Sequence, residues 1–196
     1  MRGAADVTIP DAAIRTSPLR SGMLLLALAA ALQGCAAVAP ATPARPLLNE
    51  VVIDARLVTA GQPLRAQLQA LRQQGFDAVV HIDAGQAVNA VANEAALVEA
   101  QALQYVHIAV DAQALTADDA RAVARALDRL SDRRVLVHCE QNILSSALVF
   151  LFRVVDRRED PRHALDDVER LWLPHGKIRE FLQIRLHERG IELDAI

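Results

Sequence analysis

The stretch Arg134-Val-Leu-Val-His-Cys-Glu-Gln-Asn-Ile-Leu-Ser-Ser146 decides the fold of this chain. Its first half is a short, nearly all-apolar run ending at His138, typical of a strand at the centre of a parallel sheet. Its second half turns through Cys139 into an apolar helix predicted over 145–156, with Ser145 and Ser146 as natural N-cap residues. Ligands bind where loops leave the carboxyl ends of such strands, so we expect the functional site at this turn.

Strands and helices alternate outward from this stretch. Strands are predicted over 51–53, 57–59, 77–82, 105–110 and 134–138, and helices over 64–75, 93–103, 116–130, 145–156, 161–171 and 175–189. Gly75 has the character of a helix C-cap, and Thr116-Ala-Asp-Asp119 resembles a capping box. The alternation predicts an α/β fold with a mostly parallel central sheet flanked by helices.

Composition excludes several classes of protein. The 196 residues are 53% hydrophobic and 23% charged, with a formal net charge of −3, which argues against disorder and against a fibrous repeat. Aromatic residues make up only 3% of the chain, and no basic stripe runs along it. A nucleic-acid partner is therefore not expected, because both the cationic surface and the stacking side chains are lacking.

The first 34 residues are predicted to be a signal peptide of the lipoprotein type. Arg15 and Arg20 precede an apolar run, Met23 to Leu32, that is too short to span a bilayer and is followed by Gln33-Gly34-Cys35. This arrangement resembles bacterial lipoprotein signals, which implies lipidation of Cys35 and cleavage before it. An ordinary secretory signal, an N-terminal anchor and a misassigned start codon remain as alternatives.

Residues 35–49 are rich in Ala and Pro, which predicts a tether, and residues 50–196 are predicted to be the folded domain. With Ala36 after the cysteine, the resemblance implies a protein facing the periplasm and anchored by lipid, at the outer membrane of a Gram-negative bacterium. If Cys35 is acylated, Cys139 is the single free thiol.

Cys139 is the candidate nucleophile, with a buried structural thiol as the alternative. A cysteine just before a helix N-terminus faces the positive end of the macrodipole and loop N–H groups, which favour a thiolate and a bound phosphate. His138, directly before it, is placed to orient the loop. The arrangement suits attack on an oxyanion substrate.

The sequence resembles the cysteine-dependent protein-tyrosine and dual-specificity phosphatases, near the bacterial branch that includes beta-lactamase-hydrolase-like phosphatase domains. The matching pieces occur in the family's order: Thr59-Ala-Gly-Gln-Pro63, Gly75-Phe76 with Val79-Val-His-Ile82, Tyr105-Val-His-Ile108 and Leu136-Val-His-Cys139. The resemblance implies that Cys139 attacks phosphorus and that an upstream aspartate, Asp111, protonates the leaving group. Asp118 and Asp119 are alternatives for that acid.

The resemblance also assigns the remaining site residues. His138 accompanies the nucleophile, and Ser146 donates its hydroxyl to the departing thiolate. The phosphate-binding loop corresponds to Glu140, Gln141, Asn142, Ile143, Leu144 and Ser145. A phosphorylated or anionic small molecule or protein is the implied ligand, and no cofactor is implied.

The loop departs from the family pattern in its charge. The family's loop ends in arginine, whereas this chain has Leu144 and Ser145 at the two places where it is expected, and Glu140 puts a carboxylate beside the thiol. Asn142 is predicted to adopt the left-handed conformation of the family's loop glycine. Because an arginine on a phosphoryl transition state is worth about 10³–10⁵ in rate, we predict an impaired or inactive phosphatase.

Three functional hypotheses follow. The first is an impaired phosphatase that binds an anion through loop amides, and the second is a working hydrolase with another arginine as clamp. The third is a structural or partner-binding lipoprotein, and a rhodanese-like sulfurtransferase is a weaker enzyme alternative. The arginines considered as a replacement clamp are Arg56, Arg133, Arg134 and Arg153. The strand histidines His81, His107 and His138 are expected to be structural, because their spacing along the chain does not assemble a metal-ligand set.

Overall fold

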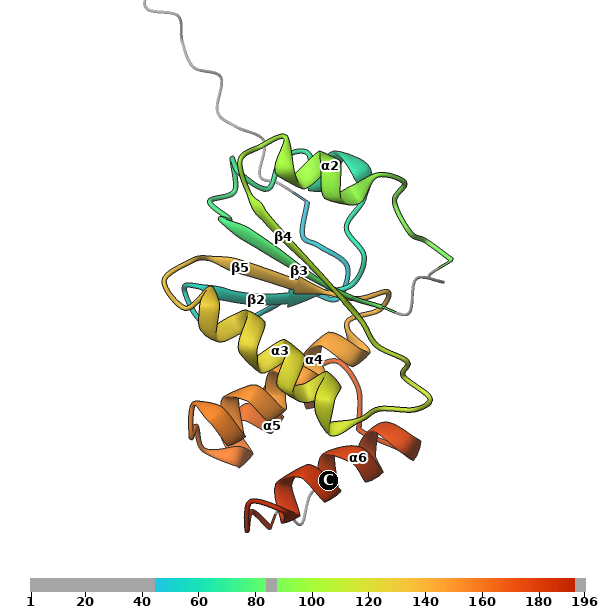
Figure 1. Cartoon of the computed structure of the whole chain (residues 1–196), viewed down its shortest axis with the longest axis vertical. Coiled ribbons are helices and arrows are strands. Elements are labelled where there is room, and N and C mark those ends of the chain that lie inside the picture. Colours follow the sequence, from blue (N-terminus) through green and yellow to red (C-terminus); the bar gives the residue numbers. More distant parts are fainter. Residues whose placement is uncertain (1–44, 84–87, 193–196) are drawn as a thin grey trace, which may run out of the picture. The chain divides into compact units, whose positions relative to one another are not determined.

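Five strands form one sheet in the order β1-β2-β5-β3-β4 (Figure 1). The computed structural model describes residues 45–83 and 88–192. The strands are β1 (Val51–Val52), β2 (Leu57–Ala60), β3 (Ala78–Asp83), β4 (Gln104–Ala109) and β5 (Val135–His138). Only β1 runs antiparallel to its neighbour, so the predicted mostly parallel sheet with β5 at its centre is confirmed.

Helices cover both faces of the sheet (Figure 1). One face carries α1 (Arg65–Leu68) and α2 (Glu94–Glu99). The other carries α3 (Ala117–Arg129), α4 (Ile143–Leu151), the π-helical segment η1 (Phe152–Asp156), α5 (Pro161–Glu169) and α6 (Gly176–His187). The mixed α/β fold predicted from the alternation is therefore confirmed. No helix among residues 45–83 and 88–192 is long and apolar enough to cross a bilayer.

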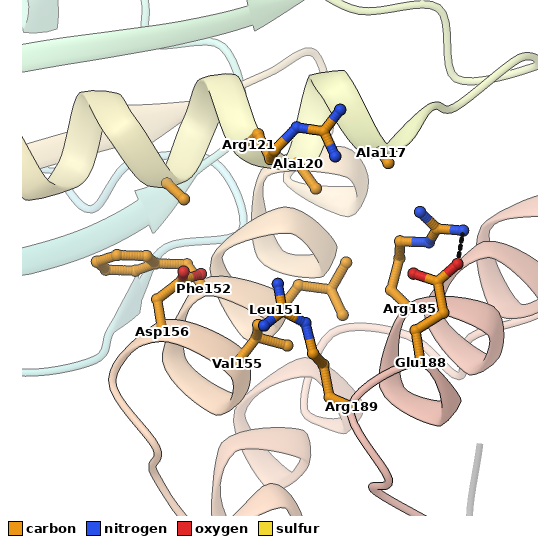
Figure 2. A pocket seen from close by; sticks show the side chains of 11 residues that line it. Ala117, Ala120, Arg121, Leu151, Phe152, Val155, Asp156, Arg185, Glu188 and Arg189 are labelled. Atoms are coloured by element: carbon orange, nitrogen blue, oxygen red, sulfur yellow. Dashed lines mark hydrogen bonds and ion pairs between the residues drawn. The ribbon is translucent and has the colours of Figure 1, made fainter.

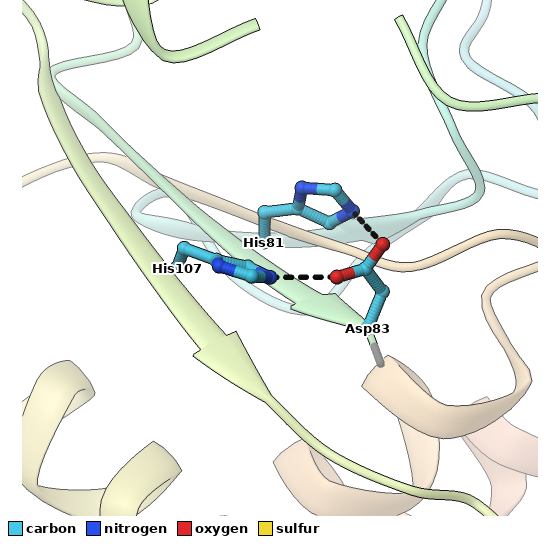
Figure 3. Close-up of side chains that lie close together, drawn as sticks. All are labelled: His81, Asp83 and His107. Carbon is cyan, nitrogen blue, oxygen red and sulfur yellow. Dashed lines mark hydrogen bonds and ion pairs between the residues drawn. The ribbon is translucent and has the colours of Figure 1, made fainter. Parts of the chain in front are cut away.

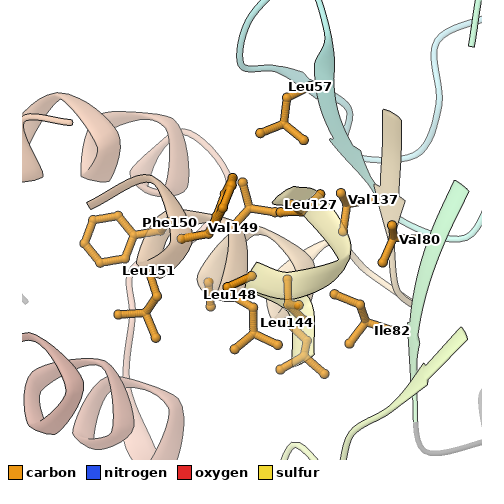
Figure 4. Close-up of a cluster of buried hydrophobic side chains, with 14 of the residues drawn as sticks. Leu57, Val80, Ile82, Leu127, Val137, Leu144, Leu148, Val149, Phe150 and Leu151 are labelled. Atoms are coloured by element: carbon orange, nitrogen blue, oxygen red, sulfur yellow. The ribbon is translucent and has the colours of Figure 1, made fainter. Parts of the chain in front are cut away.

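Side chains of β5 alternate between two separate cores. Val135 and Val137 pack with α3, α4 and α6 in the larger core, together with Leu144 and Ile82 (Figure 4). Leu136 packs on the opposite face with Val79 and Leu68. Successive side chains of a strand point to opposite faces. His138 therefore lies on the same face as Leu136, whereas Cys139 packs in the larger core with Val137.

Local signals in the sequence fix several of these boundaries. Thr116 caps α3: its side chain accepts from the Asp119 amide, and the Asp119 carboxylate accepts from the Thr116 amide at 2.7 Å. Gly75 has a φ of +84°, and beyond it the Phe76 amide donates to the Leu71 carbonyl, so the turns that follow α1 end at the predicted Gly75. Helix α1 itself is only one turn long, shorter than the predicted 64–75.

The helix after the cysteine begins earlier than predicted. Asn142, not Ser145 or Ser146, occupies its N-cap, with a left-handed φ of 68°. Both serines therefore lie inside α4. The predicted end at residue 156 is close, but the last turn is π-helical rather than α-helical, over Phe152–Asp156.

Candidate active site

The loop after β5 is held in place by the segment before α1. The Gln62 amide donates to the Glu140 carbonyl at 3.1 Å, and the Cys139 amide donates to the Ala60 carbonyl at 3.3 Å. Gly61 pairs with Gln141 in an isolated bridge, so its backbone runs directly against the loop. The run Thr59-Ala-Gly-Gln-Pro63 therefore serves as the wall on which the cysteine loop is built.

Asn142 fastens the loop to two further segments. Its side-chain amide donates to the Asn49 carbonyl at 2.6 Å and to the Thr59 hydroxyl at 3.1 Å. The Asn49 side chain in turn donates to the Gln141 carbonyl at 2.9 Å. Residues 45–49, the end of the expected tether, thus pack on the domain, and Leu47 is only 4% exposed. The left-handed backbone predicted for Asn142 is confirmed.

Cys139 lies at the first turn of α4 and is 5% exposed. The Ser145 amide points at its Sγ from 3.5 Å, and the Ser145 hydroxyl lies 3.2 Å from the same sulfur. That hydroxyl also lies 2.9 Å from Oδ1 of Asn142 and 3.4 Å from the Ala60 carbonyl, so the sulfur competes with two other acceptors for its single proton. A helix N-terminus and one hydroxyl therefore face the sulfur, as expected for a nucleophile that attacks an oxyanion.

Two residues that the sequence placed at the sulfur have other partners. Ser146 donates its hydroxyl to the Ile143 carbonyl at 3.0 Å and accepts from the Trp172 indole at 3.1 Å, so the hydroxyl at the thiol is that of Ser145. His138 is fully buried on the other face of the sheet and bonds to Glu94 at 2.8 Å. The His138 ring therefore contacts Glu94 at the end of β5 and points away from the sulfur.

A cavity of about 350 Å³ opens beside Cys139. Its lining is Ile82, Asp83, Val110, Asp111, Ala112, Cys139, Glu140, Gln141, Ile143, Leu144 and Ile178. Three carboxylates, and no arginine, lysine or histidine, are among these residues. The cavity is thus apolar and acidic, which is unfavourable for a phosphate dianion.

Asp111 reaches this cavity, whereas Asp118 and Asp119 do not line it. Asp111 is exposed and accepts from the Gln113 amide at 2.8 Å, a local turn that fixes its carboxylate. Asp119 closes the cap of α3, and Asp118 pairs with Arg121 at 2.5 Å. Of the three candidates for a proton donor, only Asp111 shares a cavity with Cys139.

Leu144 fills space beside the cysteine with an apolar side chain. It is 7% exposed and packs in the larger core near Ile82 and Val137 (Figure 4). A leucine at this place supplies neither charge nor hydrogen bonds to a bound anion.

The arginines considered as a replacement clamp lie away from the Cys139 cavity and do not line it. Arg153, only 2% exposed, bonds to Asp167 through Nη1 and to Glu159 through Nε, each at 2.8 Å. Arg134 bonds to the Gln74 carbonyl and covers the Phe76 ring, at the amino end of β5. The Arg56 carbonyl accepts from the Val135 amide at that same end, and Arg133 pairs with Asp132.

Further arginines gather around a second cavity of about 90 Å³ between α3, η1 and α6 (Figure 2). Arg121, Arg185 and Arg189 line it, and Arg185 pairs with Glu188 at 2.6 Å. This cavity shares no lining residue with the one at Cys139. It also holds Asp156, whose pKa is raised by burial and by Asp128.

A buried polar network, which linear spacing does not indicate, occupies the sheet face under α2. Glu94 accepts from Gln62 at 2.6 Å, from His138 at 2.8 Å and from Tyr105 at 3.3 Å. Burial alone would raise the pKa of Glu94, but the bond from His138, and after it the bond from Gln62, hold it below its usual value. The neighbouring Tyr105 has a raised pKa, chiefly because of burial and also because of Glu94.

His81 stacks on His138 within this network, with ring centroids 4.3 Å apart. Burial, reinforced by the proximity of His138, lowers the pKa of His81 to about 4. His81 is therefore neutral near pH 7. His81 is the register partner of His107 on β4 and of His138 on β5. The three histidines are therefore neighbours because of the strand register.

Several solved phosphatases have a similar fold. A putative phosphatase from Shewanella putrefaciens is 24% identical, with a TM-score of 0.65, over 72% of this chain and 91% of that one. Tk-PTP in its active form is 20% identical, with a TM-score of 0.59, over 72% and 97%. TpbA of P. aeruginosa is 16% identical, with a TM-score of 0.55, over 75% and 87%. No curated protein matches the sequence.

The family model and the fold together place the chain in the class of cysteine-dependent dual-specificity phosphatases. Residues 36–181 match the family described as DSP-PTPase phosphatase fused to NAD+ kinase, and the chain belongs to this family. The resemblance read from the sequence motifs is thereby confirmed. The rhodanese-like alternative is set aside, since the chain's family is that of the phosphatases.

Proposed function

We propose that this chain keeps the phosphatase fold and a cysteine at the nucleophile position but hydrolyses phosphate esters poorly or not at all. The observation that carries the proposal is the lining of the Cys139 cavity, which among the described residues includes Asp83, Asp111 and Glu140 and no cationic side chain. A phosphoryl transition state gathers negative charge, and catalysis of its transfer is largely electrostatic stabilisation of that charge.

The remaining donors do not replace an arginine clamp. The α4 N-terminus offers backbone N–H groups, and a helix dipole contributes only about 0.3–1 kcal/mol, or about 2 in a partly buried site. Loss of an arginine worth about 10³–10⁵ in rate corresponds to roughly 4–7 kcal/mol. Arg153, the nearest arginine after the loop, is already bound to two carboxylates, which argues against the hypothesis of a working hydrolase with another clamp.

The non-catalytic alternative is binding of a phosphorylated or anionic molecule or partner. A TpbA form with its cysteine replaced by serine is complexed with phosphotyrosine, and the phosphatase SIW14 of S. cerevisiae is complexed with citrate. Both of those ligands carry negative charge. With Ile143, Leu144 and Ile178 among its walls, the cavity of this chain favours a largely apolar ligand over a phosphate dianion.

Hydrolysis of an aryl phosphate tests the proposal. We expect the purified protein to turn over no faster than Cys139→Ser, and Leu144→Arg to gain activity that Leu144→Lys does not gain. The lysine variant is the matched control, because it adds charge without the planar two-pronged donor of arginine. Turnover by the unmodified protein that equals that of Leu144→Arg and disappears in Cys139→Ser would overturn the proposal. Circular dichroism checks that both variants of the buried Leu144 remain folded.

We further propose that the domain is held at a membrane by a lipid on Cys35 and faces the periplasm. The support is the run Met23 to Leu32 followed by Gly34-Cys35, which lies outside the described residues. Intact-mass analysis of the mature protein tests this proposal, with Cys35→Ser as the control. A mature protein that is unlipidated or cleaved elsewhere contradicts it.

A further inference from the structure

Three side chains at the carboxyl end of β3 and β4 converge on one point (Figure 3). Nε2 of His107 lies 2.6 Å from Oδ1 of Asp83, and Nε2 of His81 lies 3.6 Å from Oδ2 of the same carboxylate. One ligand atom from each residue falls within 4.8 Å of the other two. The two histidines are direct partners in the parallel pairing, and Asp83 follows His81 by two residues on the same face.

The proton arrangement around His81 leaves a lone pair aimed into this group. A neutral imidazole carries one ring proton, and Nδ1 lies 2.9 Å from the Tyr105 hydroxyl, which donates to Glu94 at 3.3 Å. We assign the proton to Nδ1, since the charged Glu94 is the better acceptor for the single Tyr105 proton. Nε2 is then unprotonated, has no hydrogen-bond partner among the described residues, and faces the Asp83 carboxylate.

A lone pair facing a carboxylate inside a protein is unfavourable unless a cation lies between them. We propose that His81, Asp83 and His107 form a binding site for a divalent transition metal of the zinc type. Nitrogen and oxygen atoms bound to zinc at about 2.0–2.2 Å lie roughly 3.3 Å apart in a tetrahedral site. The separations of 2.6 and 3.6 Å bracket that value, so small side-chain rotations bring the donors into place.

The surroundings meet the further requirements of such a site. The chain from His81 through Tyr105 to Glu94 provides the carboxylate-linked outer partner that fixes a metal-binding histidine. His107 is 44% exposed, which opens a path from solvent and leaves a coordination position for water. The ligands project from two hydrogen-bonded strands and not from loops, which keeps their geometry defined.

A second group, His81 with Glu94 and His138, competes for the same histidine. Its members are all buried, and Glu94 is already occupied by Gln62 and His138. The outer group has the nitrogen without a hydrogen-bond partner and the exposed ligand, so we place the metal there. The inference is independent of hydrolytic activity, and the metal would neutralise one of the carboxylates that line the Cys139 cavity.

Titration of the tag-free, chelator-treated protein with zinc, followed by calorimetry and equilibrium dialysis, tests the site. We expect one zinc ion per chain and a loss of affinity of at least about 100-fold in His107→Ala and in Asp83→Asn, since outer partners alone change affinity 10–100-fold. His163→Ala removes an exposed histidine on α5 and is the matched control, with affinity unchanged. With cobalt instead of zinc, we expect visible absorption bands that the His107 variant lacks.

Three results would overturn the site. One is the absence of binding at micromolar zinc in a protein that circular dichroism shows to be folded. Another is binding that survives in both His107→Ala and Asp83→Asn but disappears in Glu94→Gln, which would move the metal to the buried group. The third is loss of binding in Cys139→Ser, which would assign the zinc to the thiol instead.

Discussion

Nη1 of Arg153 lies 2.8 Å from Oδ2 of Asp167, inside the core formed by η1 and α5. Nε of the same guanidinium bonds to Glu159 at 2.8 Å. The arginine that follows the cysteine loop in sequence is thus a structural link between two helices, and its charge is balanced by carboxylates away from the Cys139 cavity.

Arg153→Met is expected to destabilise the protein by up to about 3–5 kcal/mol, because it removes the buried partner of Asp167 and leaves that carboxylate with the exposed Arg170. Chemical denaturation measures the loss. Arg162→Met is the control: Arg162 is half exposed and pairs with Glu169 at the surface, so its removal should cost less than about 1 kcal/mol. Equal losses in the two variants would show that Arg153 is not a buried link.

Asn142 is expected to tolerate glycine better than alanine. Both substitutions remove the side-chain bonds to Asn49 and Thr59, but only alanine must also adopt the left-handed backbone, at about 1–2 kcal/mol more. We therefore expect Asn142→Ala to unfold at lower denaturant than Asn142→Gly, and both below the unmodified protein. Alanine matching or exceeding glycine would contradict the left-handed N-cap.

Gly61→Ala is expected to displace the cysteine loop. An added Cβ would lie 2.9 Å from Cδ2 of Leu48 and 3.0 Å from the Glu140 carbonyl oxygen. The Leu48 side chain can rotate away, whereas the backbone carbonyl cannot move without the loop. The double variant Gly61→Ala, Leu48→Ala should therefore recover only part of the lost stability, as measured by thermal denaturation, and full recovery would show that the loop is not the obstacle.

The thiol of Cys139 is expected to alkylate slowly and without protection by phosphate or vanadate. It is buried, and the cavity next to it presents carboxylates to an approaching anion. Peptide mass analysis after timed exposure to iodoacetamide measures this residue separately from Cys35. Protection at millimolar phosphate would show that the loop amides alone hold an anion. Leu144→Arg provides the comparison, since an added guanidinium should introduce protection.

Sequence reasoning recovered what depends on short-range pattern. The apolar run of β5, the Thr116 cap and the Gly75 stop each follow from residues a few positions apart. The predicted N-cap of α4 was wrong. Serine is a favourable cap residue, but Asn142 occupies the N-cap because its side chain bonds to Asn49 and Thr59, which are far away in the chain.

The candidate site was predictable only in part. The place of Cys139 after the central strand, and Asp111 as the aspartate that shares its cavity, agree with the sequence reading. Ser145, and not the predicted Ser146, lies at the sulfur. Because α4 begins earlier than predicted, both serines lie inside the helix and point in different directions. The grouping of His81, Asp83 and His107 requires the register of β3 on β4, which no local pattern specifies.

His138 and Cys139 are neighbours in the chain, yet the sheet separates their side chains. The histidine belongs to the network of Glu94 and His81, and the cysteine to the cavity on the other side. The central strand therefore separates two groups of polar side chains, and Asp83 belongs to the metal-type cluster on one side and to the cavity lining on the other. Substitutions that inactivate the thiol can leave the histidine network intact, so evolution can lose or retain the two sites separately.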